Sequence, residues 1–107
     1  MPRLAVTLLG APAASTPGSP PFALGAKALA LLAYLTLEPG PHSRESLATL
    51  LWSDSGDAGA RASLRQSLKQ LRHCFGDAIV ADRRTVQLVG PVDCDVLTFL
   101  TAARQDD

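Results

Sequence analysis

The sequence predicts an α+β domain that contains a winged helix-turn-helix, and three observations carry this prediction. Residues 44–51 form a short segment with an apolar stripe, and a turn rich in Ser, Asp and Gly follows it. Residues 58–75 form a longer amphipathic segment, and two strand-like runs, 78–81 and 85–89, then flank a basic turn. A helix pair followed by a hairpin is the order of elements in this fold.

The segments before the helix pair complete the order β-β-α-α-α-β-β. Residues 4–9 have strand character, residues 11–21 are expected to form a loop, and residues 21–24 are a candidate return strand that makes the N-terminal strands antiparallel. Residues 26–38 predict a helix that is apolar almost all round. Such a helix is either central in the fold or docks one side on a partner domain.

Side chains near the helix ends support these boundaries. Ser43 is placed to cap the second helix, Glu45 in its first turn complements the helix dipole, and Asp57 is a candidate cap for the third helix. Trp52 is expected in the core. The stripes expected to be buried consist of Leu47, Leu50, Leu51, Leu64, Leu68, Leu71 and Phe75.

The composition fits one globular domain with an uneven charge. The 107 residues are 47% hydrophobic and 19% charged, and ten basic residues balance ten acidic ones. Residues 61–84 hold six basic and two acidic groups, so this segment carries +4 and the rest of the chain −4. Such a local field attracts polyanions even at zero net charge. No secretory signal or membrane span is recognisable, so we expect a cytoplasmic protein.

The third helix has two chemically different sides. Arg61, Arg65, Lys69 and Arg72 share a side next to the leucine stripe, and Gln66 and His73 lie farther round. DNA recognition needs this division, because phosphates attract cations and base edges pair with Arg, Lys, Gln or Asn. A solvated surface helix is the simpler interpretation of the same pattern.

Several motifs together resemble the N-terminal DNA-binding domain of the Streptomyces antibiotic regulatory protein (SARP) family. These bacterial transcriptional activators have a domain related to the winged-helix output domain of OmpR-like response regulators. The matching residues are 8–10, 30–35, 38–40, 43–52 and 60–68, followed by Val86, Leu88, Asp93, Asp95, Val96 and Phe99. The resemblance implies sequence-specific binding of duplex DNA, with the third helix in the major groove and the hairpin wing at the adjacent minor groove.

The same resemblance implies how the chain is divided and how it assembles. Residues 1–92 are expected to form the DNA-binding domain, and residues 93–107 the start of a linker or of a truncated activator domain. The chain is then either an excised domain or a short member of the family. It lacks a coiled-coil seam, so we expect a monomer in solution that binds as tandem copies on direct repeats.

The third helix supplies the candidate base contacts. Arg65, Gln66 and Lys69 lie in its middle, and Arg or Gln can pair with guanine or adenine edges. Arg61 contacts either a phosphate or, in an ion pair, Asp54 or Asp57, and Arg72 shares this ambiguity. His73 is expected to be solvated.

Further candidates lie outside the third helix. Arg83 and Arg84 at the hairpin tip suit a narrow minor groove, although a turn kept soluble by charge is the alternative. Ser43 and Arg44 could meet a phosphate at the N-terminus of the second helix, and capping is the simpler role for Ser43. By resemblance, the loop at 53–57 corresponds to the turn through which some relatives touch RNA polymerase.

Nothing in the sequence points to catalysis or to a cofactor. His42 and His73 are accompanied by no nucleophile motif, phosphate-binding glycine loop or metal-ligand spacing. Cys74 and Cys94 also lack such spacing, and Cys74 is expected to be a buried thiol. The competing hypothesis is a winged helix that binds protein and not DNA. An exposed apolar patch on the first or last helix would favour it.

Overall fold

The computed structural model describes residues 4–7, 13–15, 24–90 and 92–96. The chain separates into two compact units, and each is described by itself. The strand unit comprises Met1–Ala23 with Gly90–Asp107, and the helical unit comprises Leu24–Val89. The elements confirm the predicted α+β class with three helices and a hairpin wing.

The strand unit contains a three-stranded sheet in the order β2-β1-β6. Strand β1 (Leu4–Thr7) pairs antiparallel with β2 (Ala13–Ser15) and parallel with β6 (Val92–Cys94). Val6 lies opposite both Ala14 and Cys94, and all three side chains are buried. One face of this small sheet is therefore apolar.

The predicted return strand is in a different place. We expected it at residues 21–24, but β2 lies inside the stretch predicted to be a loop. Leu24 is not in a strand, and residues 21–23 lie outside the described residues. The small side chains of β2 have low strand propensity, so backbone pairing with β1 makes this strand and periodicity could not reveal it. Strand β6 was also not predicted, and it spans the domain boundary that we expected after residue 92. That boundary remains a prediction.

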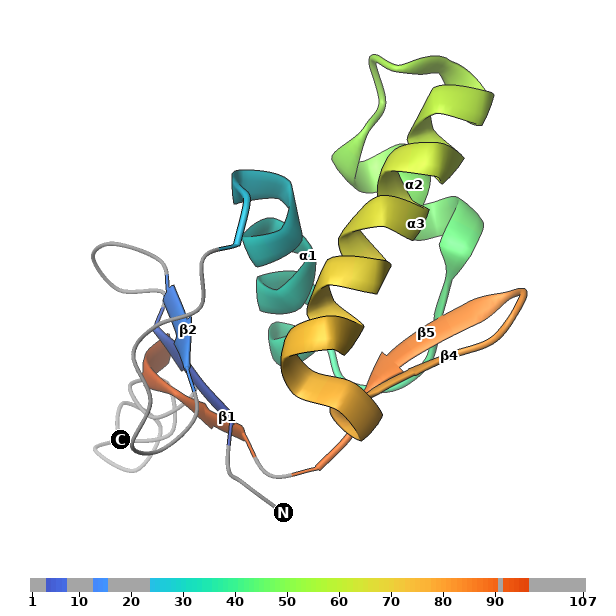
Figure 1. The fold of residues 1–107 in the computed structure, drawn as a ribbon. Coiled ribbons are helices and arrows are strands. Elements are labelled where there is room, and N and C mark those ends of the chain that lie inside the picture. Colours follow the sequence, from blue (N-terminus) through green and yellow to red (C-terminus); the bar gives the residue numbers. More distant parts are fainter. Residues whose placement is uncertain (1–3, 8–12, 16–23, 91, 97–107) are drawn as a thin grey trace, which may run out of the picture. The chain divides into compact units, whose positions relative to one another are not determined.

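The helical unit has three helices and a second sheet. Figure 1 shows α2 and α3 side by side and the β4–β5 hairpin extending from the C-terminal end of α3. The second sheet has the order β3-β5-β4, with both pairings antiparallel. The elements of this unit are α1 (Ala26–Leu37), β3 (His42–Ser43), α2 (Arg44–Leu51), α3 (Gly56–Phe75), the 3-10 helix η1 (Gly76–Ala78), β4 (Ile79–Ala81) and β5 (Thr85–Leu88).

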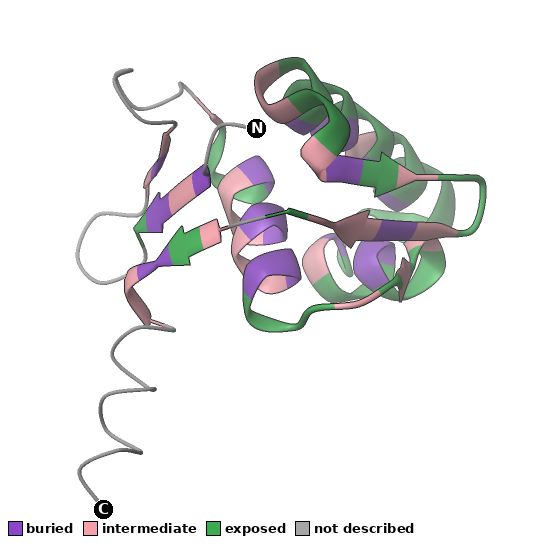
Figure 2. Cartoon of the chain, turned by 90° about the horizontal axis from the view of Figure 1, so that it is seen from below, coloured by how far each residue is buried: buried purple, intermediate pink, exposed green. Residues whose placement is uncertain are grey.

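Leucines from all three helices are buried within this part of the chain. Leu64, Leu68 and Leu71 of α3 are at most 3% exposed, as the sequence predicted, and the buried faces are drawn in purple in Figure 2. Full burial of each such side chain contributes about 1.5–3 kcal/mol. The other large side chains that are almost completely buried are Leu31, Leu32, Leu35, Leu47, Ile79 and Val86.

Three predicted core positions were wrong. Leu50 is 54% exposed, and Leu51 and Phe75 are only half-buried. The buried residues of α2 are Leu47 and Ala48, so its inward face is centred between these two positions and leaves Leu50 on the other side. The predicted stripe was drawn from the leucines of this helix alone, so it left out Ala48, which occupies one of the two buried positions. Trp52 is buried as predicted, whereas Cys74 is only half-buried.

The limits of α3 also differ from the prediction. The helix starts at Gly56 with Ser55 as its N-cap residue, so Asp57 lies in the first turn and does not cap it. A carboxylate in the first turn still complements the helix dipole. The helix ends at Gly76, whose φ of 55° is a backbone conformation that glycine adopts without strain.

Candidate nucleic-acid interface

A groove of about 730 Å³ lies in the helical unit between α2, α3 and the tip of the β4–β5 hairpin. Five arginines and two carboxylates line it, which gives the lining a formal charge of +3. The charged residues of the groove are Arg44, Glu45, Asp57, Arg61, Arg65, Arg83 and Arg84. Buried parts of Ala48, Trp52, Ala60 and Leu64 form its floor. A concave surface of this charge is suited to a polyanion.

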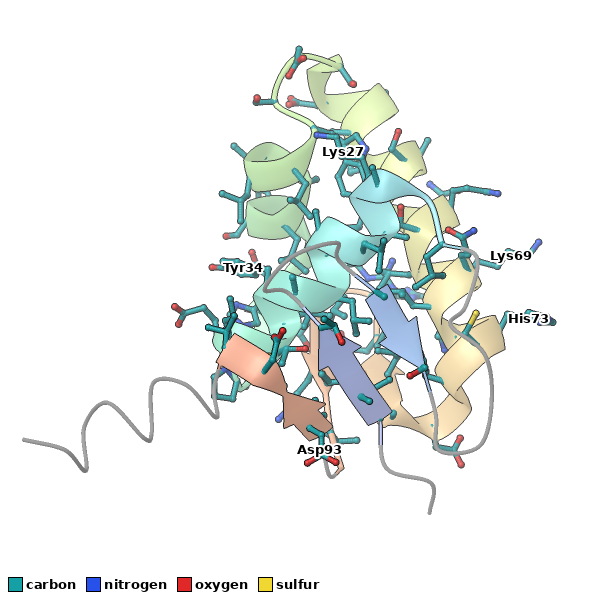
Figure 3. All side chains as sticks on the ribbon, turned by 90° about the vertical axis from the view of Figure 1, so that its left-hand side faces the viewer. Lys27, Tyr34, Lys69, His73 and Asp93 are labelled. Atoms are coloured by element: carbon teal, nitrogen blue, oxygen red, sulfur yellow. The ribbon has the colours of Figure 1, made fainter. Side chains whose placement is uncertain are left out.

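The groove brings together six of the nine residues singled out from the sequence. Ser43, Arg61 and Arg65 line it with the neighbouring arginines of α2 and of the hairpin tip. The other three, Gln66, Lys69 and Arg72, are exposed on α3 but do not line it. Figure 3 shows Lys69 and His73 projecting away from α3 on one side. The basic side chains of α3 are therefore divided between the groove and an open surface.

Ser43 caps α2, as the sequence predicted. Its Oγ accepts a hydrogen bond from the backbone N–H of Ser46 at 2.9 Å and donates to the Oγ of Ser46 at 2.7 Å. This satisfies one of the free amides of the first turn. Glu45 lies in the same turn and complements the helix dipole.

Arg44 is attached to the hairpin tip by two hydrogen bonds. Its Nε donates to the carbonyl oxygen of Asp82 at 2.6 Å, and its backbone N–H donates to the carbonyl oxygen of Arg84 at 2.8 Å. The second bond continues the ladder between β3 and β5, in which Ser43 lies opposite Thr85. Sequence reasoning treated Arg44 only as a phosphate contact and missed this role.

Asp82 organises the tip of the hairpin. One carboxylate oxygen, Oδ1, accepts hydrogen bonds from the N–H of Arg84 and the N–H of Thr85, each at 2.7 Å, and from Thr85 Oγ1 at 3.3 Å. The backbone bonds from Thr85 and Arg84 hold the pKa of this carboxyl below its usual value of 3.8. Asp is typical of such turns because its side chain can accept from amides two and three residues ahead. This preference of Asp for turns could have identified the role of Asp82 from the sequence.

The Arg61 side chain reaches the start of its own helix. Its Nε donates to the backbone carbonyl oxygen of Asp57 at 3.3 Å, so this hydrogen bond is with the main chain and not with a carboxylate. The guanidinium is exposed and lines the groove. The phosphate contact expected for Arg61 remains a prediction.

Two structural observations concern other classes of function. Among the described residues, no cluster of three or more His, Cys, Asp or Glu side chains is placed to hold a metal ion. None of the described helices combines the length and the apolar character that crossing a bilayer requires.

Comparison with known proteins gives a likeness to a solved structure. No family model matches the sequence, and no curated protein matches it. Among solved structures, the chain is similar to Mycobacterium tuberculosis EmbR, determined in complex with a low-affinity phosphopeptide, with a TM-score of 0.76 and 28% sequence identity. The alignment covers 94% of this chain and 29% of EmbR. EmbR is a SARP-family regulator, so the likeness supports the resemblance drawn from the sequence and agrees with the winged-helix fold.

Proposed function

We propose that this domain binds duplex DNA sequence-specifically as part of a bacterial transcriptional activator in the cytoplasm. The observation that carries the proposal is the groove, where arginines from α2, α3 and the hairpin tip converge on one surface. Phosphates attract these cations, and the exposed Gln66, Lys69 and Arg72 extend the polar surface along α3. The likeness to a regulator supports a DNA-binding role. In our proposal, α3 enters the major groove and the hairpin acts as a wing.

Titration of the domain with a mixed-sequence DNA duplex tests this proposal. Five or six cations directed at phosphates give a log–log slope of affinity against salt of about −5 between about 50 and 200 mM NaCl. Replacing both Arg83 and Arg84 by alanine reduces the magnitude of that slope by about 2. An Asp77→Asn variant is the matched control, because Asp77 is exposed in η1 and does not line the groove. Binding that is absent or insensitive to salt contradicts the proposal.

The alternative of a protein-binding module gains little support from the described surface. Exposed large hydrophobic side chains are Leu37, Leu50 and Val80, which lie one each on α1, α2 and β4. The last helix, α3, contributes none among its described residues. Isolated exposed apolar residues are normal on a globular protein and do not mark an interface. The DNA titration separates the two functions directly.

We further propose that the domain is a monomer in solution and binds as head-to-tail copies on direct repeats. A repeat of about 10–11 base pairs places successive recognition helices on the same face of the duplex. The loop at 53–57 is exposed, although Ser53, Gly56 and Asp57 also line the groove, and the SARP resemblance supports it as a contact for RNA polymerase. Light scattering without DNA and footprints on sites of varied spacing test the arrangement. A two-fold dimer in solution, or strict preference for inverted repeats, contradicts it.

A further inference from the structure

We infer that Arg44, Asp82 and Thr85 form a latch that holds the hairpin tip against the N-terminus of α2, and so positions Arg83 and Arg84 in the groove before DNA arrives. The inference rests on the proposed DNA-binding function. In it, Arg44 and Asp82 are positioning residues, and Arg83 and Arg84 make the contact.

The hairpin needs an external attachment to present its arginines in one place. Strands β4 and β5 contain three and four residues, and Arg83 and Arg84 lie exposed in the turn between them. The third strand of this sheet, β3, adds only two residues, and a hairpin with so little further pairing gains little stability from its sheet. Long arginine side chains on an unattached turn would lose more conformational freedom on binding than those on a fixed one.

The latch supplies that attachment from two directions. From outside the turn, Arg44 donates to the carbonyl oxygens of Asp82 and Arg84. From inside, the Asp82 carboxylate accepts from the amides of Arg84 and Thr85. The backbone amide of Asp82 also donates to the carbonyl oxygen of Thr85 at 3.0 Å, which closes the turn.

The charge of Asp82 is the second indication. An exposed carboxylate beside two arginines weakens their attraction for a polyanion, so simple electrostatics would disfavour an acid here. The Asp82 carboxylate accepts its hydrogen bonds from two backbone amides and the Thr85 hydroxyl, and the Arg44 side chain bonds the carbonyl oxygen of Asp82 instead. Asp82 therefore acts through the conformation of the turn.

Ser43 and Arg44 are consecutive residues, and together they connect the N-terminus of α2 to the hairpin tip, which form two walls of the groove. Ser43 caps α2 through Ser46, and the next residue holds the hairpin tip. Both residues also continue the pairing of β3 with β5. The N-terminus of α2 and the tip are thus fixed to the same two-residue segment, and their cations keep one spacing.

The closing experiment compares the DNA affinity of Asp82→Ala, Asp82→Asn and Glu45→Ala with that of the parent. All three variants remove one negative charge near the arginines of the groove: Glu45 lines the groove, and Asp82 precedes Arg83, which also lines it. If charge alone matters, all three bind a mixed-sequence duplex more tightly.

The latch instead predicts that Asp82→Ala binds about threefold to tenfold more weakly, because it removes the acceptor. Asp82→Asn keeps an acceptor oxygen, so it and Glu45→Ala bind at least as tightly as the parent. Tighter binding by Asp82→Ala overturns the inference.

Arg44→Lys tests the other half of the latch. Lysine keeps the positive charge but has no Nε–H in the position that reaches the Asp82 carbonyl. The latch predicts that Arg44→Lys loses affinity to nearly the same degree as Arg44→Gln. If lysine restores the parent affinity, Arg44 is only a cation for phosphate and the latch is wrong.

A measurement without DNA keeps this inference separate from the proposed function. ¹⁵N relaxation reports the order of the Arg84 and Thr85 amides in the free protein, and thermal melting checks that each variant is folded. The latch predicts lower order at these amides in Asp82→Ala and Arg44→Lys, with unchanged order in Glu45→Ala. If the parent binds no duplex, the proposed function fails while these amides still decide the latch. Unchanged order in Asp82→Ala overturns it.

Discussion

The two halves of α3 carry similar side chains in different surroundings. In residues 56–65, Arg61 and Arg65 line a groove that α2 and the hairpin tip complete. In residues 66–75, Lys69 and Arg72 are exposed on a surface outside that groove. On the adjacent side, the buried face of Ala60, Leu64, Ser67, Leu68 and Leu71 runs through both halves.

This difference shows that the sequence of one helix reveals its buried face, which depends on periodicity, but not the environment of its exposed face, which depends on packing. The spacing of leucines depends only on helical periodicity, so Leu64, Leu68 and Leu71 could be assigned from the sequence. The environment of the arginines depends on which other elements pack beside each turn, and no local pattern encodes that. The groove around Arg61 and Arg65 is therefore a result of packing that the sequence pattern of α3 alone does not reveal.

The largest expected effect tests the face that the two halves share. Leu68→Ala should lower the free energy of unfolding by about 2–5 kcal/mol, because Leu68 is 3% exposed and its loss leaves a cavity. Leu50→Ala is the matched control, since Leu50 is 54% exposed and its loss should cost well under about 1 kcal/mol. Urea unfolding measures both. Equal stabilities would show that α3 is not oriented as described.

The same contrast explains what the sequence could and could not provide. The class, the three helices, the hairpin and the Ser43 cap were predicted, because capping and periodicity are local signals. The strands β2, β3 and β6 were missed or misplaced, because each has only two or three residues, and β3 and β6 pair with strands distant in the sequence. The contacts of Arg44 with the hairpin were missed for the same reason, since 38 residues separate it from Asp82.

The second prediction distinguishes base contact from phosphate contact within α3. Arg65→Ala and Gln66→Ala should each cost about 1–3 kcal/mol on the preferred site and flatten the preference at one base position. Arg72→Ala, which alters the second half of the helix, should weaken binding to all sequences by a smaller factor. Selection from a random duplex pool gives the preferences. If Arg72→Ala changes the preferred sequence and Gln66→Ala does not, base contact and phosphate contact are assigned to the wrong residues.

A third prediction concerns the hairpin tip, which lines the groove together with residues of the first half of α3 and with none of the second half. Arg83→Ala should weaken binding to every sequence alike and reduce the salt slope by about 1, because it removes one cation near the phosphates. Lys27→Ala is a control outside the groove, since Lys27 donates to the carbonyl oxygen of Leu51 and does not line the groove. Titrations at several salt concentrations on preferred and random duplexes measure both quantities. A change in sequence preference would mean that Arg83 senses the shape of the minor groove.

The smallest expected effect is a shift in the titration of Asp82. Hydrogen bonds from the amides of Thr85 and Arg84 favour its charged form, so its pKa lies below 3.8. A lowered pKa means that the carboxylate stabilises the folded turn above pH 3.8, and that this contribution is lost as the pH falls through the lowered value. The chemical shifts of the Asp82 carboxyl carbon and of the Thr85 amide should therefore titrate together below that pH. Thr85→Val removes the hydroxyl donor at 3.3 Å but keeps the backbone amide, so it should raise the pKa of Asp82 only slightly. A midpoint at or above 3.8 in the parent would mean that the backbone amides of the turn do not hold the carboxylate. The hairpin tip, which lines the groove beside the first half of α3, would then lack a fixed position.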